Sequence, residues 1–195
     1  MLERALINTI LGDAHFWKHP ESRHHNIVWT SVHRSWLEWK QQNLLPEDVR
    51  LPIYVQRAAG SLGCFSNAKT LYAMKCRAVP EVDLGINWSV SEALQRADSL
   101  DLAIWYLDDG CCVSRKDTEN SYRVTISVGS STAEDIFPQA MRLLGTSDLG
   151  RVYKNNSRAS EKNKSWIIPK TAAVQILAVA RRIAPPEMQY KTPLW

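Results

Sequence analysis

Two aspartates follow apolar segments at matching places in the two halves of the 195-residue chain. Asp13 lies in the segment LINTILGDA, and Asp109 lies in LAIWYLDDG, about half the chain later. An aspartate at the carbonyl end of a helix is unfavourable by roughly 0.3–1 kcal/mol, because that end carries partial negative charge. A divalent cation would reverse this sign, since carboxylates and terminal carbonyls are the hard oxygen ligands of magnesium. Two acids with bound metal ions are typical of phosphodiester hydrolysis.

Helices are predicted to position both aspartates. Apolar residues recur with helical spacing over Leu2–Leu11, and Gly12 is a typical helix end. In the second half, Asp98 suits a helix N-cap with Asp101 as its acidic partner, so a helix is predicted over 100–107. Two such helices packed side by side would bring the two aspartates together.

The remaining pattern predicts an internal repeat. Strands are predicted at 15–18, 26–32, 51–57, 61–65, 122–128, 150–155 and 166–168, and further helices at 34–43, 68–76, from about 90, at 132–144 and at 171–183. The order helix, hairpin, helix, hairpin, helix therefore occurs twice. We expect an α+β fold of two pseudo-symmetric αββαββα halves, 1–97 and 98–195.

The predicted strand at 122–128 alternates cleanly between apolar and polar residues. Its polar positions are Arg123, Thr125 and Ser127. Such alternation predicts one buried and one solvent-facing side.

Charge favours a nucleic-acid partner only weakly, because the formal net charge is +4. The segment 151–170 is more informative, since it holds six basic residues against one acid. A local excess of this kind suits a phosphate-facing surface, although a solvated loop explains it equally well.

Four cysteines are scattered through the chain without a C-x-x-C pair: Cys64, Cys76, Cys111 and Cys112. They are interpreted as free thiols of an intracellular protein, in an organelle or in a bacterial or phage cytoplasm. No apolar run approaches the roughly 18 residues of a membrane span, and no signal peptide is visible, so no membrane partner is expected.

Three segments resemble the two-motif, monomeric LAGLIDADG homing endonucleases, in the branch that contains the yeast mitochondrial omega-intron enzyme. Residues 10–14 (ILGDA) resemble the first motif, 102–110 the second, and 186–193 (PEMQYKTP) the C-terminal signature. The resemblance implies antiparallel sheets that form a DNA-binding saddle, with the motif helices at the interface between the halves. It also implies an intron-encoded, site-specific endonuclease that makes a double-strand break in DNA. The implied cofactor is Mg²⁺, for which Mn²⁺ or Ca²⁺ can substitute in binding.

The same resemblance implies roles for individual residues. Asp13 and Asp109 match the metal-binding catalytic acids, and Gly12 and Asp108 precede them and would offer main-chain carbonyls. Lys191 matches a basic residue near the scissile phosphates.

In the first half the place that matches Lys191 holds Arg77, where the family usually has lysine. Arginine keeps its charge but cannot deprotonate, so a water-activating role there is in doubt. Lys75 lies close by in the sequence and is the alternative.

Candidates for binding double-stranded DNA are polar or basic residues of strands and loops. Strand side chains of this kind read base edges, whereas basic residues hold phosphates. The predicted set is Lys18, Arg57, Lys75, Arg115, Arg123, Thr125, Ser127, Arg151, Lys154, Arg158, Lys162 and Lys164.

Several other interpretations were compared with this one. Tyr106–Asp109 matches the Y-x-D-D box of reverse transcriptases, but it follows a helix N-cap signal. All five histidines lie in the first 33 residues. No later histidine can complete an HNH or zinc site, and no cysteine is close to them in the sequence. An RNA maturase that binds intron RNA, or a DNA-binding protein that does not cleave, would keep the fold and lose the nuclease activity.

Overall fold

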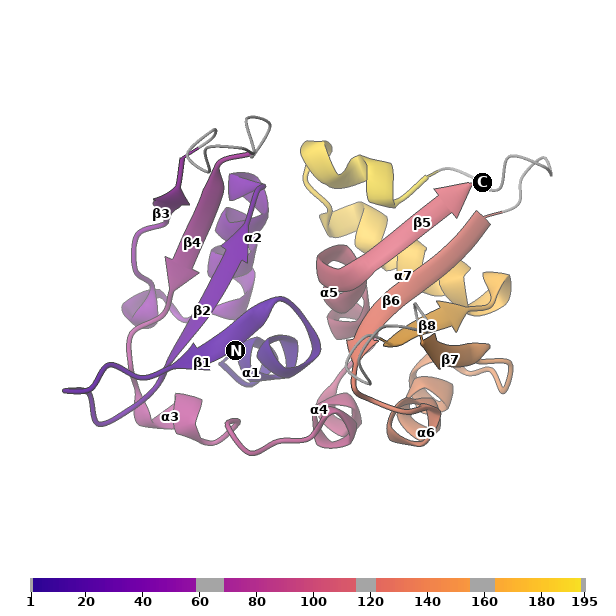
Figure 1. The fold of residues 1–195 in the computed structure, drawn as a ribbon, viewed down its shortest axis with the longest axis horizontal. Coiled ribbons are helices and arrows are strands. Elements are labelled where there is room, and N and C mark those ends of the chain that lie inside the picture. The colour runs from indigo at the N-terminus through magenta and orange to yellow at the C-terminus, as the bar shows by residue number, and fades with distance from the viewer. Residues whose placement is uncertain (1, 59–68, 115–121, 155–163, 194–195) are drawn as a thin grey trace. The chain divides into compact units, whose positions relative to one another are not determined.

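The computed structural model describes residues 2–58, 69–114, 122–154 and 164–193. The chain forms two compact units, Met1–Asn87 and Trp88–Trp195. Each unit contains a four-stranded antiparallel sheet with helices packed against it (Figure 1).

The first unit begins with the helix that was predicted to carry Asp13. Its elements are α1 (Leu2–Leu11), β1 (Ala14–Trp17), β2 (Asn26–Ser31), α2 (Arg34–Leu44), the 3-10 helix η1 (Glu47–Val49), β3 (Tyr54–Arg57), β4 (Leu71–Lys75) and α3 (Pro80–Asp83). The strand order is β1-β2-β4-β3, and α2 packs against the two central strands. Trp29, Leu37 and Met74 are fully buried in this layer.

The second unit repeats the same order of elements after one additional helix. It contains α4 (Val90–Arg96), α5 (Ser99–Asp109), β5 (Gly110–Ser114), β6 (Tyr122–Gly129), α6 (Ala133–Leu144), β7 (Arg151–Lys154), β8 (Lys164–Ile168), α7 (Lys170–Ile183) and the 3-10 helix η2 (Pro186–Lys191). The strand order β5-β6-β8-β7 is that of the first sheet. The predicted α+β fold with two similar halves is therefore present.

The two units separate after Asn87, earlier than the expected division at 97. The reason is α4, which packs against α6 of the second unit. Arg142 of α6 strengthens this packing, because its guanidinium donates to the carbonyls of Leu94, Gln95 and Ala97 at 2.9, 3.2 and 3.3 Å.

Local signals in the sequence determine several helix ends. The Asp98 carboxylate accepts from the N–H groups of Leu100 and Asp101, and the Asp101 carboxylate accepts from the N–H of Asp98 at 2.9 Å. This reciprocal capping box starts α5 where the sequence predicted a helix. Thr132 caps α6 in the same way with Asp135.

One predicted helix is wrong. Residues 68–76 were expected to be helical, but Leu71–Lys75 form strand β4 between β2 and β3. Leucine, alanine, methionine and lysine favour helices, yet this propensity is weak and pairing with two neighbouring strands overrides it. The strand predicted at 61–65 lies outside the described residues, as does Cys64. Strand β5 was not predicted.

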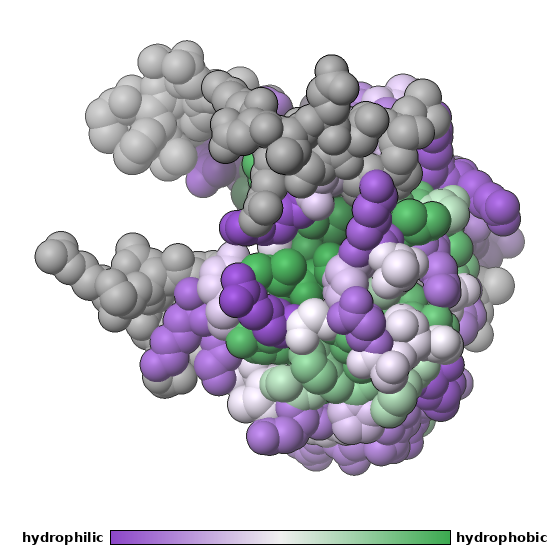
Figure 2. Space-filling model, turned by 90° about the vertical axis from the view of Figure 1, so that its right-hand side faces the viewer, coloured by the Kyte–Doolittle hydropathy of each residue, from purple (hydrophilic) through white to green (hydrophobic). Residues whose placement is uncertain are grey.

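Hydrophobic residues appear among hydrophilic ones on the face drawn in Figure 2. Met141 and Val174 are among the exposed apolar side chains of the second unit. Single exposed apolar side chains of this kind are usual for folded proteins. Among the described residues, no helix is both long and apolar enough to span a membrane.

Candidate active site

Each unit places an aspartate at the corner between the first strand of its sheet and the helix directly before that strand. In the first unit α1 ends at Leu11, the Gly12 N–H donates to the Asn8 carbonyl at 3.1 Å, and β1 begins directly after Asp13. In the second unit α5 ends at Asp109 and β5 begins at the next residue. The two aspartates therefore occupy the same topological position, as the repeat predicted.

The corner of the second unit requires glycine after the aspartate. The Gly110 N–H donates to the Tyr106 carbonyl and closes the last turn of α5. A Cβ added at Gly110 would lie 2.2 Å from Cδ2 of the Tyr106 ring and 2.3 Å from the Tyr106 carbonyl oxygen. No side chain fits there, so β5 can start against the helix end only with glycine at this position.

Lys191 lies at the carbonyl end of α5. Its ammonium donates to the carbonyls of Leu107 and Asp108 at 2.6 and 3.1 Å. A cation at this end of a helix offsets the negative end of the helix dipole. The positive charge therefore lies directly beside the peptide unit that leads into Asp109.

Tyr106, on α5, contacts the main chain of the same lysine. It is fully buried, and its hydroxyl donates to the main-chain carbonyl of Lys191. Burial, with the nearby thiols of Cys112 and Cys111, raises the pKa of the hydroxyl above its usual value. The hydroxyl thus remains protonated and remains a donor.

This corner offers two hard oxygen donors, the Asp109 carboxylate and the Asp108 main-chain carbonyl. The Asp108 carbonyl also accepts from the Lys191 ammonium at 3.1 Å, so a metal ion there would share this oxygen with another cation. Among the described residues, no group of three or more His, Cys, Asp or Glu side chains could hold a metal ion by itself. A magnesium ion at such a corner would take its other ligands from water and phosphate, as magnesium commonly does.

The first unit has a different arrangement around its aspartate. Arg77 is exposed, and its main-chain N–H donates to the Val49 carbonyl at 2.8 Å. The Lys75 ammonium lies over the rings of Trp17 and Tyr54, 4.4 and 5.8 Å from their centroids. Within the described part of the chain, neither basic residue makes a hydrogen bond or ion pair with Asp13.

Arg123, Thr125, Ser127 and Arg151 share one face of the second sheet. Thr125 pairs with Ile167, which pairs with Arg151, and directly paired residues in neighbouring strands point to the same side. The residues between them on β6, such as Val124 and Ile126, are buried. The predicted alternation of this strand is confirmed, and four of the candidate DNA contacts lie together on its polar face.

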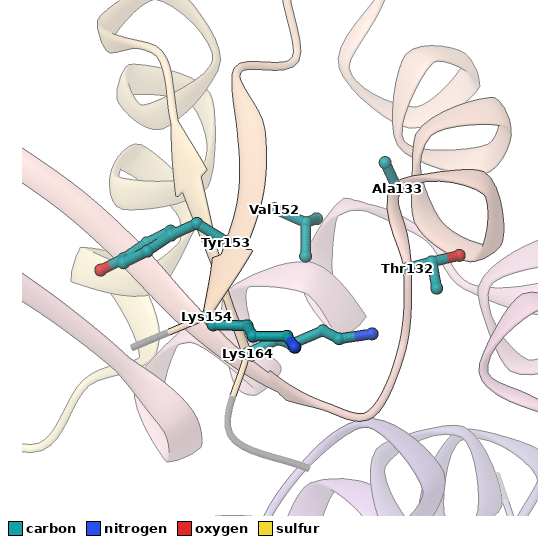
Figure 3. Close-up of a pocket in the computed structure, with 6 residues that line it drawn as sticks. All are labelled: Thr132, Ala133, Val152, Tyr153, Lys154 and Lys164. Atoms are coloured by element: carbon teal, nitrogen blue, oxygen red, sulfur yellow. The ribbon is translucent and has the colours of Figure 1, made fainter. Parts of the chain in front are cut away.

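Lys154 and Lys164 lie on the opposite face of the same sheet. They pair with each other across β7 and β8, three residues from Arg151 along β7. Their side chains point toward the start of α6 and line a cavity of about 300 Å³ with Thr132, Ala133, Val152 and Tyr153 (Figure 3). The Lys164 ammonium donates to the Ser130 carbonyl at 3.1 Å. The structure thus separates these two lysines from the other four candidates.

In the first sheet two of the candidates, Lys75 and Arg57, lie on the same face. Lys75 pairs with Val28, which pairs with His15, and Trp17 follows His15 on the same side of β1. On β3, Tyr54 pairs with Ala73 and Arg57 pairs with Leu71, so both lie on the same face as Lys75. Lys18 is exposed immediately after β1. Arg115, Arg158 and Lys162 lie outside the described residues.

Comparisons with known proteins bear on this fold. No protein-family model matches the sequence, and no curated protein does. Among solved structures, "The homing endonuclease I-WcaI bound to its DNA recognition sequence" has a TM-score of 0.75 at 15% identity, covering 100% of this chain and 86% of that chain. I-DmoI variants in complex with target DNA, in the presence of 2 mM Mn, have TM-scores of 0.53 and 0.56 at 14% identity, covering 91–92% of this chain and 91–94% of theirs.

The chain has the fold of these homing endonucleases. This result agrees with the family to which the sequence motifs pointed. The closer resemblance to the branch of the yeast omega-intron enzyme stays a prediction.

The homing-endonuclease fold removes two of the alternatives. Tyr106–Asp109 lie on the last turn of α5 rather than on a β-hairpin, so the Y-x-D-D comparison fails. His24 and His25 both direct Nδ1 to the Asp83 carboxylate, each at 2.8 Å. They tie the β1–β2 connection to α3, and among the described residues they belong to no larger group of metal-binding side chains.

Sequence reasoning missed the contact of Tyr106 with Lys191 and the cluster of Lys75 with Trp17 and Tyr54. Tyr106 and its partner Lys191 are 85 residues apart, so no local pattern connects them. Trp17 and Lys75 are also far apart in the sequence, and strand pairing brings them together.

Proposed function

We propose that the protein is a site-specific DNA endonuclease that cuts both strands of a double-stranded target, as an intron-encoded homing endonuclease does. The observation that carries this proposal is the repeated corner. Two units with the same strand order each place an aspartate between the first strand and the helix directly before it. Support comes from I-WcaI and I-DmoI, which share the fold and whose structures hold target DNA.

The polar sheet faces would supply sequence readout in this function. Arg123, Thr125 and Ser127 offer donors and acceptors from one strand, which is the arrangement that reads base edges in the major groove. Arg151 adds a positive charge on the same face. Lys154 and Lys164, on the other face, would contribute through phosphate contacts at the sheet margin.

The catalytic corners would act through Asp13 and Asp109, each serving one DNA strand. The carboxylates and the carbonyls of Gly12 and Asp108 would hold divalent ions, with Mg²⁺ as the physiological choice and Mn²⁺ or Ca²⁺ as substitutes in binding. Such ions, when bound, activate water and stabilise the leaving oxygen. Lys191, held at the end of α5, would stabilise the negative charge that develops on the phosphate.

The test is cleavage of a library of candidate intron-insertion sites with and without Mg²⁺. We expect magnesium-dependent double-strand breaks at a small set of sequences. Asp13→Asn and Asp109→Asn should abolish cleavage of the corresponding strand and keep DNA binding, whereas the exposed Asp48→Asn should behave as wild type.

Other outcomes would identify other functions. Specific binding without any cleavage by the wild-type protein would show a non-cleaving DNA-binding protein. Stimulated splicing of an intron RNA in the absence of DNA cleavage would show a maturase. The protein should be monomeric by sedimentation, and an obligate dimer would contradict the proposal that one chain supplies both corners.

A further inference from the structure

Tyr106 contacts the residue after Asp109 and the main chain of Lys191. Its ring lies against Gly110, the residue after the aspartate, so closely that no Cβ fits between them. Its hydroxyl donates to the carbonyl of Lys191, whose ammonium donates to the carbonyls of the two residues before the aspartate. One fully buried side chain therefore contacts Gly110 directly and reaches the two residues before Asp109 through Lys191.

The position of the Lys191 ammonium depends on its main chain being fixed. A lysine side chain has four rotatable bonds, so an ammonium group stays at one place only when both its ends are held. The end of η2 is held in part by Met188, which is buried, and by the Gln189 side chain, which donates to the Ala184 carbonyl at 2.8 Å. The Tyr106 hydroxyl fixes the last residue of η2 directly.

We propose that Tyr106 is a positioning residue of the second-half active site, a role that rests on the proposed nuclease function. Its hydroxyl holds the Lys191 main chain so that the ammonium stays at the carbonyl end of α5, ready to meet the scissile phosphate. A buried tyrosine hydroxyl also needs a hydrogen-bond partner for stability alone. The two roles differ in what they predict: loss of stability affects both DNA strands, whereas loss of positioning affects one.

The variant is Tyr106→Phe, which keeps the ring against Gly110 and removes only the hydroxyl. A duplex that carries the target, with a different fluorophore on each strand, reports both cleavage rates in one reaction. We expect the rate for one strand to fall about tenfold, the scale of one lost hydrogen bond, with accumulation of nicked duplex and unchanged DNA affinity. Tyr72→Phe, on β4 of the first unit, removes a hydroxyl from the other sheet and should leave both rates unchanged.

A second measurement does not require cleavage. Acetylation of Lys191 by a small amine-reactive reagent, followed by mass spectrometry, reports how firmly its amine is held. Acetylation should be several-fold faster in Tyr106→Phe than in wild type, while the exposed Lys69 reacts equally in both.

These measurements separate the possible failures. Equal slowing of both strands, or unchanged strand rates with unchanged Lys191 acetylation, would overturn the positioning role. If the wild-type protein cleaves no DNA but Tyr106→Phe exposes Lys191 to the reagent, the nuclease proposal fails and the positioning of Lys191 stands.

Discussion

Replacing Lys191 by methionine should destabilise the protein even in the absence of DNA. Methionine keeps most of the length and apolar contact of the lysine side chain and removes its charge. The substitution therefore deletes the ammonium charge and its two hydrogen bonds to the carbonyls of Leu107 and Asp108.

The expected loss in the free energy of unfolding follows from the position of those two hydrogen bonds at the end of a helix. A cation at a helix C-terminus contributes about 0.3–1 kcal/mol when exposed and up to about 2 kcal/mol when partly buried. Hydrogen bonds to charged groups contribute about 1.5–3 kcal/mol, but water will replace part of this at Asp108, which is half-buried. We expect a loss of about 2 kcal/mol in the free energy of unfolding. For a chain of this length the loss lowers Tm by about 4–8 °C.

Thermal unfolding followed by circular dichroism, in buffer without divalent ions, measures this effect. Lys69→Met is the matched control, because Lys69 is exposed and lies outside the helices and strands. An unchanged Tm for Lys191→Met would refute the assignment of Lys191 to the end of α5. A fall of equal size in the control would show that lost charge alone is responsible.

Three further predictions concern stability. Gly110→Ala should lower the free energy of unfolding by about 1–3 kcal/mol in urea titrations, because its Cβ would overlap the Tyr106 ring and carbonyl. Arg142→Met should lower it by about 1–2 kcal/mol and raise hydrogen exchange in α4, since three carbonyls at the end of that helix lose their donor. Hydrogen bonds from His24 and His25 hold the pKa of Asp83 well below its usual range, so its contribution to stability is present above about pH 4 and is lost as the pH falls below that value. Asp83→Asn should remove that part of the acid dependence, and an equally steep loss of stability between pH 4 and 2 in the variant would contradict the assignment.

Elements that depend on local signals could be predicted from the sequence. The capping box at Asp98 and the alternation along β6 each lie within a few residues, and both are confirmed. Strand β4 could not be predicted in this way. Its residues favour a helix locally, and only pairing with β2 and β3, tens of residues away, makes them a strand.

The candidate site also has one part that local sequence predicts and one part that it does not predict. The chemistry of an acid at a helix end can be inferred from nine residues of sequence, and the structure places Asp109 at such an end. The contact between Lys191 and α5 spans more than 80 residues, so composition and spacing carry no sign of it; only the resemblance to a family indicated Lys191.

The basic residues of 151–170 show why counting charges is insufficient. Arg151 and Lys154 are neighbours in sequence and both suit a phosphate-facing surface. On a strand, a separation of three residues directs side chains to opposite faces, and the pairing of β7 with β8 confirms this. A cluster of charges in sequence therefore becomes two separate surfaces in the fold.

The two aspartate corners share their topology but differ in their electrostatics. In the second unit a lysine ammonium neutralises the helix end before any metal or phosphate arrives, and glycine allows the strand to start without a gap. In the first unit, within the described residues, Asp13 is exposed and makes no ion pair with Arg77 or Lys75, whose ammonium lies over aromatic rings instead. Under the proposed nuclease function, the first corner would gain its positive charge only when DNA and metal bind, whereas the second already has it. A repeat of the fold does not by itself give two equal corners, and the proposed function then predicts unequal cleavage of the two DNA strands.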